Sequence, residues 1–488
     1  MMDQQEIQHL SDRATKVLLN KPQTAASNKG GWLMIATILI EAWDLYAISF
    51  LLIFVKKEFF PNPWELGLIA GGVQAGALVG AIFGGLLADK FGRRRMFLAT
   101  MCLFIVLAVA QAFAWSIASL IVIRFLIGLP LGSDIANGYA YIMESMSKGK
   151  REVMGSRWQF FFGLGEVVCI LVVTAMYATG MGQGILWRIG LAIGAIPAIF
   201  LLLARLDLPE TPLSLIQRGR FVEAKQVSLR LFNDPLDMLP DEDVQIEKPK
   251  TGDFLKVIWA DPIKKRASIF GWISNACQGA EFTAWAFYLP VILAVAGVGV
   301  SKGGGLVGTN LVTAGIFCLA TISGFVAPIM LPKIGHKGLS MWGFGLAFFG
   351  LIGGAFALQN NWKLMIVLFA CVLMWGHYWD ASNGMTICSL VAPARFKATA
   401  SGFGYIFVKA ASFFGAFAFP VLSSAWGTFG ATLAVATLSL TGFLAAKFIL
   451  PEVYGYVETE GTTTPPPPPS PPPPWRDRPS DPLGVKSV

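Results

Sequence analysis

Long apolar segments separated by polar connections dominate the chain. Six apolar segments, each near the roughly 20 residues that a helix needs to cross a bilayer, lie at residues 31–55, 67–88, 96–114, 117–143, 157–180 and 184–206. After a polar stretch, six more lie at residues 267–298, 305–330, 338–358, 363–392, 397–423 and 428–450. The pattern predicts an all-α polytopic membrane protein with twelve transmembrane helices in two six-helix bundles.

Composition and charge agree with a membrane protein. The 488 residues are 55% hydrophobic and only 14% charged, which excludes a water-soluble globule. The net charge of +8 comes from Lys and Arg in the even-numbered connections, such as residues 90–95, as the positive-inside rule requires. We therefore predict a multi-pass protein of the cell membrane with both termini in the cytoplasm. The basic charge indicates topology and a lipid bilayer as partner, not nucleic acid.

The polar segments divide the chain into five regions. Residues 1–30 lack a signal-peptide pattern and are expected to form a mobile cytoplasmic tail. Residues 31–206 and 267–450 are predicted to form the two bundles, and residues 207–266 a cytoplasmic linker with short helices. Residues 451–488 end in a Pro-rich stretch that cannot build a core and predicts a disordered tail. A protein that binds such a Pro-rich tail is a further possible partner.

Two landmarks occur in both halves. The charged turn at residues 89–95 returns in weakened form at residues 332–337, and Pro209-Glu210-Thr211 is echoed by Pro451-Glu452-Val453. The repetition indicates an internal duplication and makes the two bundles pseudo-symmetric. The second segment also carries Gly72, Gly76, Gly80 and Gly84 on one helix face. That face predicts close packing with a neighbouring helix, either static or at an interface that moves.

Several motifs resemble those of the major facilitator superfamily over about residues 31–460. Gly85-x-x-x-Asp89-Lys90-x-Gly92-Arg93-Arg94 matches its loop motif. Further motifs resemble those of the sugar-porter branch: Arg124-x-x-x-Gly128-x-x-x-Gly132 with Glu144, Trp187-Arg188, Pro209-Glu210-Thr211-Pro212, and Gly219-Arg220 with Glu223-Ala224. The first segment, Glu41-Ala-Trp43-Asp44-Leu-Tyr46, is closer to the proton-coupled phosphate and aromatic-acid branches. The resemblance implies two six-helix bundles around a central cavity.

The resemblance also implies a cytoplasmic gate. Besides the motif glycines Gly85 and Gly92, the residues that resemble the ion-pair network of this superfamily are Asp89, Arg93, Glu144, Arg151, Arg188, Glu210 and Arg395. Such a network holds the bundles together while the cavity opens outward. The second half carries Leu390 and Pro332 where acidic residues are expected, so we expect the first half to carry most of this latch.

Proton coupling is predicted at a charge pair on the first and fourth segments. Asp44 lies near the middle of the first segment, and Arg124 lies on the fourth, which runs the opposite way. Sugar-proton symporters that the sequence resembles have an Asp and an Arg at matching positions. An Arg keeps its proton, so the carboxylate is the partner that can switch. The alternative is a permanent structural ion pair, and Glu41 is the reserve candidate for the coupling group.

Polar side chains at membrane depth are the candidates for solute binding, because each is costly there unless it faces a cavity or a partner. The predicted set is Asp134, Gln159, Asn275, Gln278, Glu281, Asp380, Asn383 and Lys409. Neutral donors and acceptors suit a sugar, whereas Lys409 would suit an organic anion or be a structural lysine. His377 and Asp380 are interpreted as a cavity pair, since no third metal ligand is near in sequence. No metal site and no cofactor are predicted.

These features favour a secondary active transporter that works by alternating access, a proton-coupled symporter that imports a sugar or an organic acid. Two alternatives remain open: an inorganic phosphate symporter, against which Ala276 stands where an aspartate is expected, and a non-transporting nutrient sensor on the same scaffold. An enzyme is not expected, because no catalytic triad, metal-ligand cluster or nucleotide loop is found.

Overall fold

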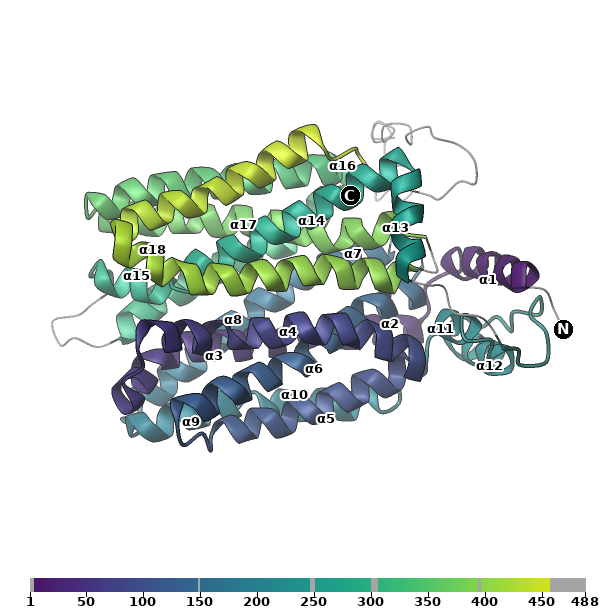
Figure 1. Ribbon diagram of the computed structural model, residues 1–488, viewed down its shortest axis with the longest axis horizontal. Coiled ribbons are helices and arrows are strands. Elements are labelled where there is room, and N and C mark those ends of the chain that lie inside the picture. Colours follow the sequence, from purple (N-terminus) through teal and green to yellow (C-terminus); the bar gives the residue numbers. More distant parts are fainter. Residues whose placement is uncertain (1–3, 148–149, 246–250, 300–305, 394–395, 457–488) are drawn as a thin grey trace, which may run out of the picture.

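The computed structural model describes residues 4–147, 150–245, 251–299, 306–393 and 396–456, and in these ranges all regular elements are helices. They gather into two bundles that lie side by side, the first purple to blue and the second green to yellow in Figure 1. The first bundle consists of α2 (Ala25–Ile35), α3 (Thr37–Phe59), α4 (Pro63–Phe91), α5 (Arg93–Gln111), α6 (Ile117–Ser145), α7 (Lys150–Ser156), α8 (Trp158–Ala178), α9 (Gln183–Ala192) and α10 (Ala195–Arg205). The second consists of α14 (Pro262–Glu281), η1 (Phe282–Ala286), α15 (Leu289–Val295), α16 (Val307–Gln359), α17 (Lys363–Val391) and α18 (Lys397–Phe448).

Helix length explains how these elements make twelve crossings. Among the described residues, nine helices are long and apolar enough to cross a membrane. Two of them, α16 with 53 residues and α18 with 52, would span about 80 Å if straight, far more than a hydrocarbon core of about 30 Å. Each changes direction at a glycine with positive φ, Gly335 in α16 and Gly427 in α18. With the seventh crossing divided among α14, η1 and α15, the predicted pair of six-helix bundles is confirmed.

A glutamate closes the turn at equivalent places in the two halves. Glu210 accepts backbone N–H groups of Arg93 at 2.9 Å and of the next residue at 3.1 Å. Glu452 accepts those of His336 at 2.9 Å and of the residue after it at 3.2 Å. The first N–H groups of a helix lack partners within the helix, and an anion there is also favoured by the helix dipole. The repeated Pro-Glu motif therefore caps one helix in each half.

The end of the bundles near these caps also carries the helices of the polar regions, and we name it the linker end (Figure 1). These helices are α1 (Gln4–Leu19), α11 (Pro212–Ile216), α12 (Phe221–Phe232) and α13 (Thr251–Ala260). Ala14 and Leu18 of α1 are buried against Leu215 and Phe221 of the linker. The prediction of a mobile tail is therefore wrong for α1, because its apolar face finds a partner in the linker helices. The predicted disordered tail begins too early at residue 451, because Glu452 caps a helix and Val453 is buried in a core cluster. Residues 457–488, which hold the Pro-rich stretch, lie outside the described residues.

The glycine face of α4 packs against α6 within the same bundle. A Cβ atom at Gly76 would lie 1.9 Å from the carbonyl oxygen of Phe125, and one at Gly128 would lie 2.3 Å from that of Val73. Only glycines permit so close an approach of two helix backbones. The contact lies inside one bundle, which favours the static role over a moving interface, and it fixes the position of Arg124 on α6.

Two glycine substitutions should separate backbone strain from the loss of a cap. Gly335 and Gly427 have φ values of 71° and 69°, so alanine costs about 1–2 kcal/mol of folding free energy at either position. A Cβ at Gly335 would also lie 2.2 Å from Oε2 of Glu452, whereas one at Gly427 meets nothing within 4 Å. We therefore expect Gly335→Ala to lower the melting temperature of the purified protein more than Gly427→Ala. Equal losses would contradict the role given to Glu452.

Candidate functional site

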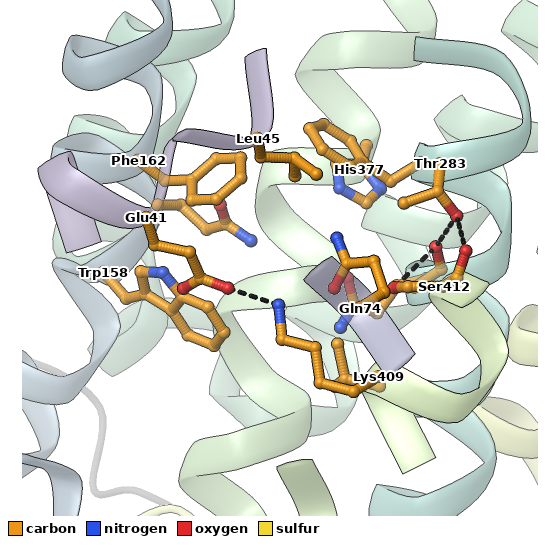
Figure 2. A pocket seen from close by; sticks show the side chains of 14 residues that line it. Glu41, Leu45, Gln74, Trp158, Phe162, Thr283, His377, Lys409 and Ser412 are labelled. Carbon is orange, nitrogen blue, oxygen red and sulfur yellow. Dashed lines mark hydrogen bonds and ion pairs between the residues drawn. The ribbon is translucent and has the colours of Figure 1, made fainter. Parts of the chain in front are cut away.

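A cavity lies between the two bundles, about halfway along their helices (Figure 2). The first bundle contributes α3, α4 and α8, and the second contributes α14, η1, α17 and α18. The lining residues are Glu41, Leu45, Gln74, Trp158, Gln159, Phe162, Gln278, Gly279, Phe282, Thr283, His377, Val408, Lys409 and Ser412. Aromatic walls with a few convergent polar groups are typical of small-molecule sites.

Neutral polar groups point into this cavity from both bundles. Gln159 of α8 and Gln278 of α14 line it, and both were predicted to bind solute. The indole nitrogen of Trp158 and the amide oxygen of Gln74 have no hydrogen-bond partner among the described residues. Buried polar groups of this kind are costly when they stay unpaired. They therefore suit a ligand that offers several hydroxyl groups.

An ion pair joins the two bundles at the cavity wall. Lys409 of α18 bonds to Glu41 of α3 (Figure 2). Tyr405 donates its hydroxyl to the same Glu41 oxygen at 2.9 Å. The side chains of Lys409 and Glu41 are 6% and 3% exposed. The positive charge of Lys409 is thus already neutralised by a carboxylate from the other bundle. The prediction left Lys409 as a solute ligand or a structural lysine, and in this structure it has a structural partner.

The predicted coupling pair lies together in the first bundle. An Arg124 guanidinium nitrogen is 3.5 Å from Oδ2 of Asp44, and the two side chains are 0% and 2% exposed. Gln111 bridges them, because its amide donates to Asp44 at 3.0 Å and its carbonyl accepts from Arg124 at 3.0 Å. Arg124 also donates to the carbonyl of Ile69 at 3.0 Å. These bonds hold the arginine in place whether or not the carboxylate is charged.

Five of the eight predicted solute ligands do not line the cavity, and Asp134, Asn275 and Asn383 are three of them. Asp134 of α6 accepts two bonds from Arg205 of α10 at 2.9 and 3.0 Å. Asn383 of α17 bonds to the ring and carbonyl of His336, both at 2.8 Å. Asn275 of α14 is fully buried, and its amide nitrogen faces sulfur atoms at 3.9 and 4.0 Å. These positions give Asp134 and Asn383 local structural partners.

Glu281 and Asp380 lie behind His377, which lines the cavity. Nδ1 of His377 is 3.3 Å from Oε1 of Glu281 and 3.8 Å from Oδ1 of Asp380. The ground for excluding a metal site, that no third ligand lies near His377 and Asp380, is therefore wrong, because Glu281 supplies one. Neither carboxylate lines the cavity. The three side chains offer ligand atoms within 4.8 Å of one another, so they can bind protons or a metal ion.

The predicted gate residues form a compact cluster at the linker end. Arg93 donates to Glu144 at 3.0 Å and to Asn137 at 3.5 Å, and Glu144 accepts the hydroxyl of Thr211 at 2.6 Å. Gly92 has a φ of 98°, and a Cβ there would lie 2.4 Å from Oε2 of Glu210. All these groups come from the first half of the chain, and none of the bonds named here reaches the second bundle.

The remaining gate predictions have different outcomes. Arg151 is buried on α7, and a Cβ at Gly85 would meet nothing within 4 Å. The side chain of Asp89 and all of Arg395 lie outside the described residues. Arg188 was grouped with the cytoplasmic gate, and this placement is wrong. It pairs at 2.9 Å with Glu58 at the end of α3, opposite the linker end. The rest of α9 and all of α10 lie between Arg188 and the Pro-Glu motif, so the two are at opposite ends of the bundle.

The comparisons with known proteins agree with this geometry. The profile of the sugar (and other) transporter family matches residues 32–460, which is most of the chain. The chain belongs to the sugar (and other) transporter family. It is 26% identical over 426 residues to the probable metabolite transport protein CsbC of Bacillus subtilis (strain 168), covering 86% of this chain and 90% of that protein. It is 25% identical over 465 residues to the arabinose-proton symporter of the same strain, covering 91% and 97%.

A solved structure gives the same fold. The proton:xylose symporter XylE of the major facilitator superfamily, bound to 6-bromo-6-deoxy-D-glucose, matches with a TM-score of 0.74 at 18% identity. The match covers 89% of this chain and 98% of that one. The family match shows a multi-pass membrane transporter and not an enzyme, and the structural match shows the major facilitator superfamily fold that the motifs predicted.

Some cavity residues were missed by sequence reasoning. Trp158, Phe162 and Thr283 line the cavity. They lie in apolar segments, where a hydrophobic or small polar residue does not indicate by itself whether it faces a cavity, a neighbouring helix or lipid. The π-helical element η1, which carries Thr283, is the kind of irregular turn often found at functional sites. The sequence pattern predicts an ordinary helix at residues 282–286 and not this irregular turn.

We expect Asp134 to act in stability and not in solute binding. Asp134→Asn leaves the buried Arg205 without its anionic partner, which typically costs about 3–5 kcal/mol and should lower the melting temperature strongly. The double variant Asp134→Asn with Arg205→Gln should recover part of the loss, because neither charge is then left unpaired. A stable Asp134→Asn protein with weakened solute binding would contradict this assignment.

Proposed function

We propose that this protein is a proton-coupled symporter that imports a sugar across the cell membrane by alternating access. The observation that carries the proposal is the cavity between the bundles, with aromatic walls and neutral groups such as Gln159 and Gln278. A hydroxyl-rich solute satisfies such groups without bringing charge into the membrane. The similarity to the arabinose-proton symporter supports the same solute class.

The state of Lys409 favours a sugar over an organic acid or phosphate. An anionic solute needs a cation that is free to receive it. Among the described residues that line the cavity, Lys409 is the one lysine or arginine, and it is already paired with Glu41. An anion would have to break this pair and leave the Glu41 carboxylate uncompensated. The non-transporting sensor has no observation in its favour.

Asp44 is proposed as the proton-coupling residue. Since Arg124 stays charged under all physiological conditions, protonation of Asp44 removes one side of the pair and frees the guanidinium. Gln111 and the Ile69 carbonyl then keep Arg124 hydrogen-bonded, which reduces the cost of the separated state. A proton on Asp44 thus weakens the contact between α3 and α6 and leaves the buried Arg124 charge with neutral hydrogen-bond partners only, so that the protonated state is the costlier one.

The cluster around Arg93, Glu144 and Glu210 is proposed as the gate. It lies at the linker end, where the positive-inside rule places the cytoplasm, and α7 from this end contacts α17 of the second bundle. Opening of the cavity toward the cytoplasm would have to loosen these contacts. We further propose that both termini are cytoplasmic and that the Pro-rich tail serves as a docking segment for a Pro-binding protein.

Transport into vesicles tests the proposed function. The purified protein is reconstituted into liposomes and given a panel of pentoses, hexoses, organic acids and phosphate under a pH gradient. We expect one or more sugars to accumulate above the external concentration, and a protonophore to abolish the accumulation. Accumulation of an organic acid or phosphate alone would refute sugar transport, and accumulation of no solute would refute the symporter.

Asp44→Asn separates coupling from movement of the solute. The variant cannot gain or lose a proton at this position, so we expect accumulation of sugar to be lost while exchange of sugar across the membrane stays measurable. Glu41→Gln is the comparison, because Glu41 pairs with Lys409 and not with Arg124. If proton-driven accumulation survives in Asp44→Asn and disappears in Glu41→Gln, Glu41 is the coupling residue instead.

Two residues on α14 provide a matched test of the binding cavity. A ligand that binds only the folded protein raises its melting temperature, so the transported sugar should stabilise the wild type. Gln278 lines the cavity, whereas Asn275 lies on the same helix outside the lining. We expect Gln278→Ala to reduce the sugar-induced rise at least severalfold and Asn275→Ala to leave it unchanged. The reverse result would move the site away from this cavity.

A further inference from the structure

Glu281, His377 and Asp380 form a buried group of titratable side chains in the second bundle. The three residues are 1%, 3% and 0% exposed. Oε1 of Glu281, Nδ1 of His377 and both carboxylate oxygens of Asp380 have no hydrogen bond among the described residues. The other oxygen of Glu281 is held by the hydroxyl of Ser439. The unpartnered atoms are thus the ones that face the centre of the group.

The internal repeat shows how unusual Asp380 is. Asp134 and Asn137 have the same spacing on α6 as Asp380 and Asn383 on α17. Asn137 contacts Arg93, just after Gly92, and Asn383 bonds to His336, just after Gly335. Asp134 and Asp380 therefore occupy equivalent places in the two bundles.

The partners of the two aspartates differ. Asp134 is bonded to Arg205 and to the hydroxyl of Thr100 at 3.1 Å. Arg205 lies five residues before Glu210, and the residue five before Glu452 is Lys447. Lys447 is therefore the equivalent of Arg205, and it is exposed. The position equivalent to Thr100 is Gly343, where a Cβ would lie 2.8 Å from Cβ of Asp380. The second bundle keeps the carboxylate and lacks both of its partners.

The group of Glu281, His377 and Asp380 has an excess of negative charge when both carboxylates are ionised, unless it binds a further positive charge. Two carboxylates face one imidazole, which carries at most one positive charge. The other groups nearby are the Cys277 thiol on α14, the Ser439 hydroxyl on α18 and the backbone of Gly343 on α16. Lys409, across the cavity, is paired with Glu41. An uncompensated charge buried in this way costs several kcal/mol, so at least one further proton must be bound.

A path for that proton leads through His377. Its ring lines the cavity beside Gln278 and stacks on Phe282 with ring centroids 4.7 Å apart, while Nδ1 faces the two carboxylates. The ring can accept a proton at Nε2 from cavity water and release the Nδ1 proton to Oε1 of Glu281, 3.3 Å away. One proton enters, one is passed on, and the imidazole returns to neutral with its tautomer exchanged.

We propose that Glu281, His377 and Asp380 form a second proton-binding site, distinct from Asp44, that loads from the solute cavity and couples a second proton to each solute. This inference rests on the proposed symport. This second site lies beside the cavity, and a solute that covers His377 closes the path from the cavity to the two carboxylates. Proton binding at the site is therefore coupled to solute binding. The two bundles then carry one coupling site each.

The balance between a pH gradient and a sugar gradient measures the number of coupled protons. Liposomes with an interior one pH unit more alkaline, and with the membrane potential clamped at zero by potassium and valinomycin, are loaded with the sugar that accumulates best. Net flux stops when the inside-to-outside sugar ratio balances the protons, at about tenfold for each coupled proton. We expect about 100-fold for the wild type and about tenfold for Glu281→Gln and for Asp380→Asn.

The controls make each outcome decisive. Cys277→Ala alters packing beside the same carboxylates and should keep the wild-type ratio. Two isosteric variants are used, so that the failure of one to fold leaves the other. A wild-type ratio near tenfold, or variants that keep the wild-type ratio, would overturn the second site while leaving the symport proposal intact. Stoichiometric zinc or manganese in the purified protein, lost in both variants, would also overturn it in favour of a metal site. Absence of any proton-driven flux would instead overturn the symport itself.

Discussion

The cost of an uncompensated charge in an apolar interior governs how this protein is built. Most of the buried ionised groups described above have a partner of opposite charge on another helix: Asp44 with Arg124, Asp134 with Arg205, Glu144 with Arg93, and Glu41 with Lys409. Three of these pairs connect helices that are not consecutive in the chain, and the pair of Glu144 with Arg93 connects the consecutive helices α6 and α5. The same bonds that neutralise the charges therefore also set which helices are neighbours, and a change in one charge has consequences for helix packing.

The internal duplication lets the two halves be compared residue by residue. Glu210 and Glu452 cap equivalent helices in the same way, so the fold of each half keeps this bond. The neighbouring positions have diverged, since Arg93 with Glu144 in the first half corresponds to His336 with Leu390 in the second. The capping bond is needed wherever the chain turns at Gly92 or Gly335. The ion pair is present in one half alone, so the turn itself does not depend on it.

The sequence was sufficient for the features that depend on local pattern. Apolar length predicted the twelve crossings, and the depth of Asp44 and Arg124 in opposed segments predicted that they could meet. Pairs that depend on how helices rotate about their own axes were not predictable. Glu281 was known to lie at membrane depth, yet no periodicity tells which neighbour its carboxylate faces. Arg188 was misplaced for a simpler reason: it lies near the start of the span Gln183–Arg205. The helical residues that follow it in this span cover roughly 26 Å at 1.5 Å per residue, which separates it from Pro209 by most of the membrane thickness.

The Glu41–Lys409 pair has a consequence for coupling between the bundles. Of the four pairs above, it is the one whose partners come from different bundles, and it lies in the wall of the cavity. Alternating access requires the two bundles to move relative to each other, so this bond must adapt or break during the cycle. Breaking it without compensation would leave two buried charges. A bound solute with hydroxyl groups can hydrogen-bond to both, and the energetic cost of separating the bundles then depends on whether the cavity is occupied.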